Sequence, residues 1–440
     1  MYSFWVALLL ITEIVLFLVA FEGDWISPSV VTLMFFILST VSCLYGISDW
    51  KNVIFTGKAY SLFSLAFIIM IMVEKWVAKH KIIICKKVNL QRKNEPSRGI
   101  IIIESPFDKI IFIVFLAAAL LYIYRVVKSG MSLGAASVLY AIGANKEDGD
   151  FDGISRFLYN LVRIASYGYI VMVSNNIFAC KQRPRKCIKE IIIIFLTLLM
   201  TFFSGQRSAT ICYIVSIVVA VFISLYDRNK GSLNKDIKKY VNKIAVIAIL
   251  VVVLFFLSAN IVKNSNDDRH FIDYLTYYFG STTALMGNIV EDPSCCHYPF
   301  VGYFGEKTFM GFWSTLYSWG IVSQAPADRR WINMGAHIAN RAGNEYTFLC
   351  GPYIDFGFVG ALIFVAVFYG IFSYLYYWKI RRCQNFVKRI KNTAIYIFLY
   401  SMVAMAFYQD TIRTYSRPIN VLYIIYIVMF CKIFLRIKME

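Results

Sequence analysis

The sequence predicts an all-α polytopic membrane protein with about eleven transmembrane helices and one large extracytoplasmic loop. Hydrophobic residues make up 59% of the 440 residues, and the mean hydropathy is +0.62. Soluble proteins contain about 45–50% apolar residues. Several apolar stretches also reach the length of about 20 residues that a helix needs to cross a bilayer. The composition therefore excludes the soluble protein classes.

The first candidate span begins at the N-terminus. Met1–Ala20 lacks a basic leading region and a small-residue cleavage site, so we expect a retained helix rather than a signal peptide. The candidate spans are 2–21, 29–48, 53–73, 110–127, 155–178, 190–204, 209–226, 244–262, 356–377, 393–409 and 419–436. We expect a membrane domain over 1–262, the large outer loop over 263–355 and C-terminal spans over 356–440.

Four basic loops carry the net charge of the chain. Together they contain 26 Lys and Arg against 7 Asp and Glu, a difference equal to the formal net charge of +19. They are Glu74–Lys109, Lys181–Glu190, Asp227–Lys243 and Trp378–Asn392. Basic loops remain cytoplasmic. We therefore expect these loops and the C-terminus on the cytoplasmic side of the membrane, facing anionic lipid rather than nucleic acid.

The cytoplasmic loop 74–109 contains two β-branched runs. Ile82–Cys85 and Ile100–Ile103 flank the polar, Pro-containing stretch Asn89–Arg98. This pattern is typical of a small β-hairpin. Anchoring of the two runs at the membrane interface explains the same pattern, and the sequence leaves both interpretations open.

The outer loop 263–355 is long, aromatic and poor in net charge. A loop of this length is usually a functional element. Its tyrosines and tryptophans suit the apolar faces of sugar rings, or equally helices that lie in the membrane interface. The ten cysteines form no CxxC pair, so we expect no metal site. A disulfide between Cys350 and Cys295 or Cys296 is left open.

A short turn, Ser204–Ser208, joins two candidate spans at the outer face. Gly205 permits a tight reversal. Arg207 lies where the next helix begins, and a helix N-terminus beside a guanidinium favours an anion. The alternative is an arginine that extends to the membrane interface without binding a ligand.

A second polar segment runs from Asn344 to Gly360 and leads into a span. Asp355 lies at the mouth of that helix, where an acid interacts favourably with the helix dipole, as a simple N-cap also would. The outer histidines could accept a proton from a sugar hydroxyl near pH 7, although each is also compatible with a structural role. They are His270, His297 and His337.

These motifs resemble the O-antigen polymerase (Wzy-type) and oligosaccharide repeat unit polymerase families. The resemblance rests on the SGQRS turn at Ser204–Ser208, the long outer loop and the NEYT…DFGFVG stretch from Asn344 to Gly360. Arg269, followed by Gly280 after ten residues, resembles an Arg-x10-Gly pattern of some polymerases. O-antigen ligases usually place His directly before the Asn, where this chain has Gly343. The general layout agrees over most of the chain.

The resemblance implies a C-type glycosyltransferase-like membrane fold that joins undecaprenyl-diphosphate-linked oligosaccharides without metal or cofactor. Its implied catalytic residues are His337, Glu345 and Asp355. The implied diphosphate contacts are Arg207, Arg269, Arg341, Arg413 and Arg417, and the other substrate contacts are Asn344 and Tyr346. Expected partners are the lipid-linked oligosaccharide, membrane lipids, a chain-length regulator and a flippase. The product is O-antigen or capsular polysaccharide.

Three other functions remain open. A lipid-linked oligosaccharide flippase also has many spans, but usually lacks one dominant outer loop. An O-antigen ligase performs the same chemistry with a different acceptor. An unrelated permease is expected to show broken spans with charges at the membrane midplane, for which Glu13 and Lys58 are the candidates.

Overall fold

The computed structural model describes residues 2–47, 49–80, 100–104, 108–132, 153–204, 207–228, 271–296, 300–326, 332–334, 342–343 and 346–439. Seven helices in this part of the chain are long and apolar enough to cross a membrane. They are Tyr2–Ala20, Pro28–Gly46, Gly57–His80, Lys109–Ser132, Gly153–Ala179, Ser208–Arg228 and Cys350–Arg381. The prediction of an all-α polytopic membrane protein is confirmed at this level.

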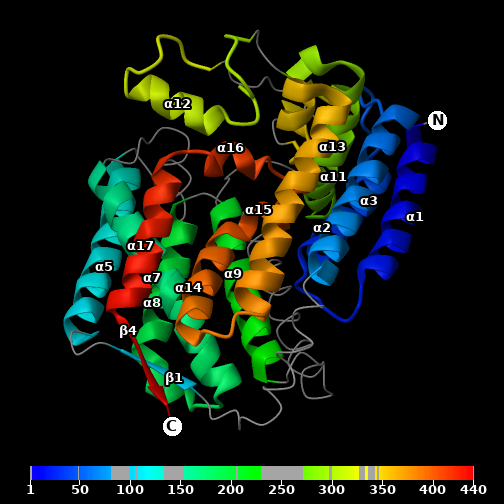
Figure 1. Ribbon diagram of the computed structural model, residues 1–440. Coiled ribbons are helices and arrows are strands. Elements are labelled where there is room, and N and C mark those ends of the chain that lie inside the picture. Colours follow the sequence, from blue (N-terminus) through cyan, green and yellow to red (C-terminus); the bar gives the residue numbers. More distant parts are fainter. Residues whose placement is uncertain are drawn as a thin grey trace. The chain divides into compact units, whose positions relative to one another are not determined.

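The chain divides into two compact units, which we describe separately. Unit 1 comprises Met1–Lys93, Arg269–Trp378 and Met402–Leu422, and unit 2 comprises Asn94–Asp268, Lys379–Ser401 and Tyr423–Glu440. The helices of unit 1 are α1 (Tyr2–Ala20), α2 (Pro28–Gly46), α3 (Gly57–His80), α11 (Phe271–Glu291), α12 (Met310–Ser318), α13 (Cys350–Tyr374), α15 (Ser401–Ala404) and α16 (Thr411–Tyr415) (Figure 1).

Helix α11 occupies residues that we expected in the outer loop, and it packs along α2. The Ser39 hydroxyl donates to the Phe279 carbonyl at 2.6 Å and lies 2.8 Å from the Thr283 hydroxyl. Gly280 touches the backbone of α2, since a Cβ there would lie 2.5 Å from the Cys43 nitrogen. The range 263–355 thus contains a long packed helix as well as irregular chain.

Gly280→Ala should separate α11 from α2, because the α2 backbone cannot move aside as a flexible side chain could. Overpacking of this kind costs about 1–3 kcal/mol. Gly153→Ala is the matched control, since nothing lies within 4 Å of a Cβ at that position. Thermal unfolding of the detergent-solubilised protein should show a lower midpoint for Gly280→Ala alone. Equal midpoints for the two variants would contradict the close α2–α11 contact.

Two carboxylates are buried among the helices of unit 1. Glu13 of α1 accepts a hydrogen bond from the Thr40 hydroxyl of α2 at 3.0 Å. Glu74 of α3 accepts from the Ser29 amide at 2.7 Å and from the Tyr377 hydroxyl at 3.0 Å. The Thr40 hydroxyl is thus the partner that the sequence did not reveal for Glu13.

Helix α13 begins at Cys350, earlier than the predicted span 356–377, and is interrupted at Gly357. Gly357 has φ 69° and ψ −167°, a conformation that side chains disfavour, and it marks a kink in the helix. Beyond it, large apolar side chains are exposed at four-residue intervals: Val359, Ile363, Val367 and Ile371. An exposed apolar stripe at helical spacing is typical of a face that contacts lipid.

Unit 2 is also helical and contains a small sheet. Its elements are β1 (Ile100–Glu104), α5 (Asp108–Ser132), α7 (Gly153–Ser174), α8 (Ile188–Phe203), α9 (Arg207–Arg228), α14 (Phe386–Leu399) and β4 (Leu435–Met439), with most of α17 (Ile419–Ile433). A π-helical segment, Asn175–Ala179, extends α7, and Pro184–Cys187 forms a 3₁₀ turn before α8.

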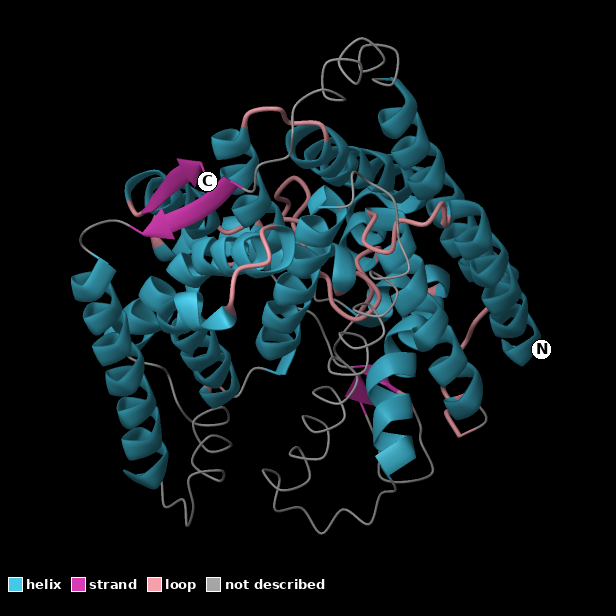
Figure 2. Cartoon of the chain, turned by 90° about the horizontal axis from the view of Figure 1, so that it is seen from below, coloured by secondary structure: helices cyan, strands magenta, loops and turns pink. Residues whose placement is uncertain are grey.

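Strand β1 pairs antiparallel with the C-terminal strand β4, and Figure 2 shows both beside the C-terminus. The Asn176 side chain donates to the Ile102 carbonyl at 2.7 Å and accepts from the Ile102 amide at 3.0 Å. The predicted run 100–103 therefore is a strand, but the partner shown is the C-terminus. The expected partner, Ile82–Cys85, lies outside the described residues. The pairing places the end of loop 74–109 and the C-terminus together.

Three other predicted boundaries differ. The span 190–204 corresponds to α8, which has 16 residues. The span 393–409 is not one helix, because α14 ends at Leu399 and the four-residue α15 follows. The span 419–436 ends as helix at Ile433, where β4 takes over. The span 244–262 lies outside the described residues.

Candidate functional site

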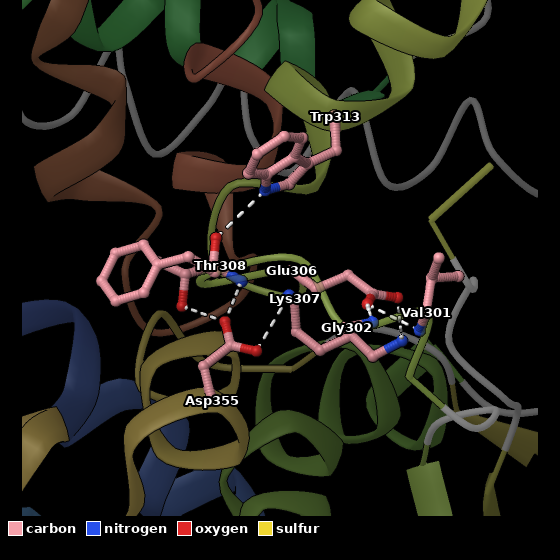
Figure 3. Close-up of polar contacts among 8 residues, drawn as sticks. Val301, Gly302, Glu306, Lys307, Thr308, Trp313 and Asp355 are labelled. Atoms are coloured by element: carbon pink, nitrogen blue, oxygen red, sulfur yellow. Dashed lines mark hydrogen bonds and ion pairs between the residues drawn. The ribbon is translucent and has the colours of Figure 1, made fainter. Parts of the chain in front are cut away.

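The candidate site lies in unit 1, where the segment 300–313 crosses the start of α13. The Asp355 carboxylate accepts three hydrogen bonds from this segment (Figure 3). They come from the Lys307 amide at 3.1 Å, the Thr308 amide at 2.6 Å and the Thr308 hydroxyl at 2.7 Å. Asp355 is therefore not the N-cap of α13, which begins five residues earlier. It holds the turn at Lys307–Thr308.

A fully buried ion pair continues this turn. Lys307 Nζ lies 3.4 Å from Glu306 Oε1, and both side chains are 0% exposed. Glu306 also accepts from the amides of Val301 at 2.9 Å and Gly302 at 3.1 Å. The ammonium lies 4.9 Å from the centre of the Phe300 ring. Because buried charges require partners, these contacts fix the segment in one conformation.

Lys307→Met should destabilise the protein by about 3–5 kcal/mol, because it leaves the Glu306 carboxylate buried without its cation. The double variant Glu306→Gln/Lys307→Met should lose less, since it removes both charges and keeps a carbonyl oxygen for the amides of 301 and 302. Thermal unfolding of both variants measures the difference. A double variant less stable than Lys307→Met would contradict the ion pair.

Helix α16 contacts the same segment. A Cβ on Gly311, at the start of α12, would collide with the Arg413 carbonyl oxygen and lie 2.8 Å from Arg417 Cγ. The two helices therefore meet at position 311, which has no room for a side chain larger than the hydrogen atom of glycine. The buried Asp410 carboxylate lies beside Gly351, whose Cβ position is 2.7 Å from Asp410 Oδ2 and 2.9 Å from Thr308 Cα.

Aromatic side chains cover the segment. The rings of Tyr303 and Trp313 stack with centroids 4.6 Å apart, and the Trp313 indole donates to the Phe304 carbonyl at 3.1 Å. Phe304 contacts Phe356 at 5.3 Å. Further exposed apolar side chains are Phe300, Tyr317, Trp319 and Ile321. These exposed side chains are compatible with both interpretations that the sequence left open, contact with a sugar ring and contact with the membrane interface.

The structure brings only some of the predicted site residues together. Asp355, Arg413 and Arg417 each contact the 305–311 segment. Tyr346 is fully buried, so its ring supports the core of unit 1. The predicted residues outside the described part of the chain are Arg269, His337, Arg341, Asn344 and Glu345. Cys350 is a free, buried thiol, so the disulfide left open above is not formed.

Arg207 begins α9 in unit 2, as the SGQRS turn predicted. The position of its side chain lies outside what the structure describes. Gly280, the glycine of the Arg-x10-Gly pattern, has a packing role against α2. Its place in that pattern therefore has a structural explanation.

Sequence reasoning missed Glu306, Lys307, Thr308 and Gly311. The only signal was an adjacent Glu–Lys pair inside an apolar, aromatic stretch, which is unusual because charged residues are seldom buried unless paired. Among the described residues, no group of three or more His, Cys, Asp or Glu side chains is placed to hold a metal ion. In comparisons with protein-family models, curated proteins and solved structures, no match was found.

Proposed function

We propose that this protein polymerises undecaprenyl-diphosphate-linked oligosaccharide repeat units at the outer face of the bacterial plasma membrane. The observation that carries the proposal is the packing of segment 305–311 between Asp355 and α16. The Arg413 carbonyl and the Arg417 side-chain stem contact Gly311 of this segment, two residues before Trp313 of a stacked aromatic pair, and a buried ion pair holds the segment. Guanidinium groups bind diphosphate, and aromatic faces cover sugar rings.

The reaction requires little from the protein beyond position and charge. An acceptor hydroxyl oxygen forms a bond to the anomeric carbon of the donor, and its proton passes to water or a base. The bond from that carbon to undecaprenyl diphosphate breaks, and the diphosphate leaves with the electron pair. Negative charge grows on the leaving group, which fixed arginines stabilise without a cofactor.

Deletion of the gene tests the proposal in the cell. Surface polysaccharide separated on a gel should lose its ladder and retain a band of one repeat unit, since a ligase can still transfer single units. Loss of both the ladder and the single-unit band would contradict a polymerase and favour a flippase or a ligase.

A flippase is the second candidate function. The buried carboxylates Glu13 and Glu74 favour it, since ionisable side chains inside membrane helices often belong to transport pathways. Both carboxylates are, however, hydrogen-bonded between helices of unit 1. This arrangement also suits a role in helix packing.

A further inference from the structure

Arg163 is a charged side chain in the middle of a candidate span of unit 2. It lies ten residues into α7, about 15 Å from the start of the helix. A guanidinium remains protonated in proteins. A charged side chain at this depth is costly, and it usually marks a ligand or ion site.

Tyrosines surround the Arg163 guanidinium. Its central carbon lies 5.1 Å from the ring centre of Tyr159 and 6.0 Å from that of Tyr423. One of its nitrogens donates to the Asn160 side-chain oxygen at 3.2 Å. These groups hold the guanidinium by cation–π contact and a neutral hydrogen bond. Both interactions fix the position of the guanidinium.

The turn of α7 that carries Arg163 contacts α9 through Ser166, whose hydroxyl donates to the Arg163 carbonyl at 2.6 Å. Tyr213 lies in the second turn of α9. The Tyr213 hydroxyl donates to Ser166 of α7 at 2.8 Å. The second turn of α9 therefore lies beside the turn of α7 that carries Arg163.

Thr210 adds an independent polar group. It lies one turn before Tyr213 and hence on the face of α9 that packs against α7. Its side chain is 4% exposed, and its hydroxyl has no hydrogen-bond partner among the described residues. Buried hydroxyl groups are normally hydrogen-bonded. A ligand oxygen beside the first turn of α9 would supply the missing partner.

We infer that Arg163, Thr210 and the N-terminus of α9 form a binding site for the diphosphate of a polyprenyl lipid. The guanidinium supplies charge and paired donors, the first turn of α9 supplies amide donors, and the Thr210 hydroxyl supplies one more. The apolar helices that surround these groups suit the hydrocarbon part of a lipid. The inference deepens the proposed function and rests on it for the choice of a polyprenyl chain.

Binding of geranylgeranyl diphosphate to the purified full-length protein tests the site. Arg163→Ala and Arg163→Gln should each weaken binding at least about 10-fold, the equivalent of 1.4 kcal/mol. Gln keeps a planar hydrogen-bonding group, so Arg163→Gln remains informative if Arg163→Ala fails to accumulate. Thr210→Val should weaken binding by a smaller factor. Arg156→Ala, an exposed arginine in the first turn of α7, is the matched control and should bind as the wild type does.

Two further ligands show which part of the lipid diphosphate is recognised: geranylgeraniol has the lipid chain alone, and inorganic diphosphate has the anion alone. Both should bind at least about 10-fold more weakly than the lipid diphosphate. Equal affinity for inorganic diphosphate would overturn the lipid assignment, and wild-type binding by folded Arg163→Gln would overturn the site. The assay requires no polymerisation. Arg163-dependent binding in a protein whose deletion leaves the ladder intact would therefore reject the proposed function and keep the site.

Discussion

Asp355→Ala should abolish polymer formation while leaving the protein inserted in the membrane. The carboxylate accepts hydrogen bonds from the amides of Lys307 and Thr308 and from the Thr308 hydroxyl. Hydrogen bonds to a charged group contribute about 1.5–3 kcal/mol each. Loss of all three should release the 305–311 segment and lower the polymerisation rate by more than about 100-fold, at 1.4 kcal/mol per factor of ten.

Two further variants separate positioning from catalysis. Thr308→Val removes one of the three hydrogen bonds and should lower the rate by a smaller factor. Asp355→Asn keeps one acceptor oxygen and should fall between Thr308→Val and Asp355→Ala. A catalytic carboxylate, as the family resemblance implies, would instead make Asn and Ala equally inactive and leave Thr308→Val at the wild-type rate. The order of the three rates decides between the two roles.

Removing the charges of Arg413 in α16 and of Arg417, which follows the helix, should have the second-largest effect. The double variant Arg413→Ala/Arg417→Ala should polymerise more slowly than the wild type. Each arginine that contacts the diphosphate should contribute about 2–4 kcal/mol of transition-state stabilisation, as one oxyanion donor does. Arg417 also packs its stem on Gly311, so part of any loss from alanine could come from packing.

Charge and packing can be separated at Arg417. Arg417→Met keeps the aliphatic stem and loses the charge, so it should be as slow as Arg417→Ala. Arg417→Lys keeps the charge and loses the paired donors, so it should be intermediate. Chain-length distributions at matched protein levels measure the effect. Wild-type ladders from Arg417→Met and from the double alanine variant would remove α16 from the site.

The membrane helices were predictable because their signal is local. An apolar run of about 20 residues has few other uses, so α1, α2, α3 and α9 appear close to their predicted positions. Helix α11 was not predicted, because its polar residues take part in helix packing. Ser39 and Thr283 meet across α2 and α11, so hydroxyl groups that read as loop residues are buried between helices.

The candidate site was less predictable because it depends on contacts between distant parts of the chain. The sequence indicated that Asp355 begins a helix, but not that Thr308 would donate to it. No periodicity connects Gly311 with Arg417. The C-terminal strand was missed for the same reason, since Leu435–Met439 gains strand character only by pairing with Ile100–Glu104.

The most direct test is polymerisation by the purified protein in proteoliposomes supplied with a synthetic undecaprenyl-diphosphate-linked repeat unit. We predict a ladder of products, with one undecaprenyl diphosphate released per linkage, in wild-type protein and not in Asp355→Ala. The ladder should persist in EDTA, because arginines can neutralise the leaving diphosphate in place of a metal ion. Transfer of the intact repeat unit across the bilayer without any product longer than one unit would contradict a polymerase.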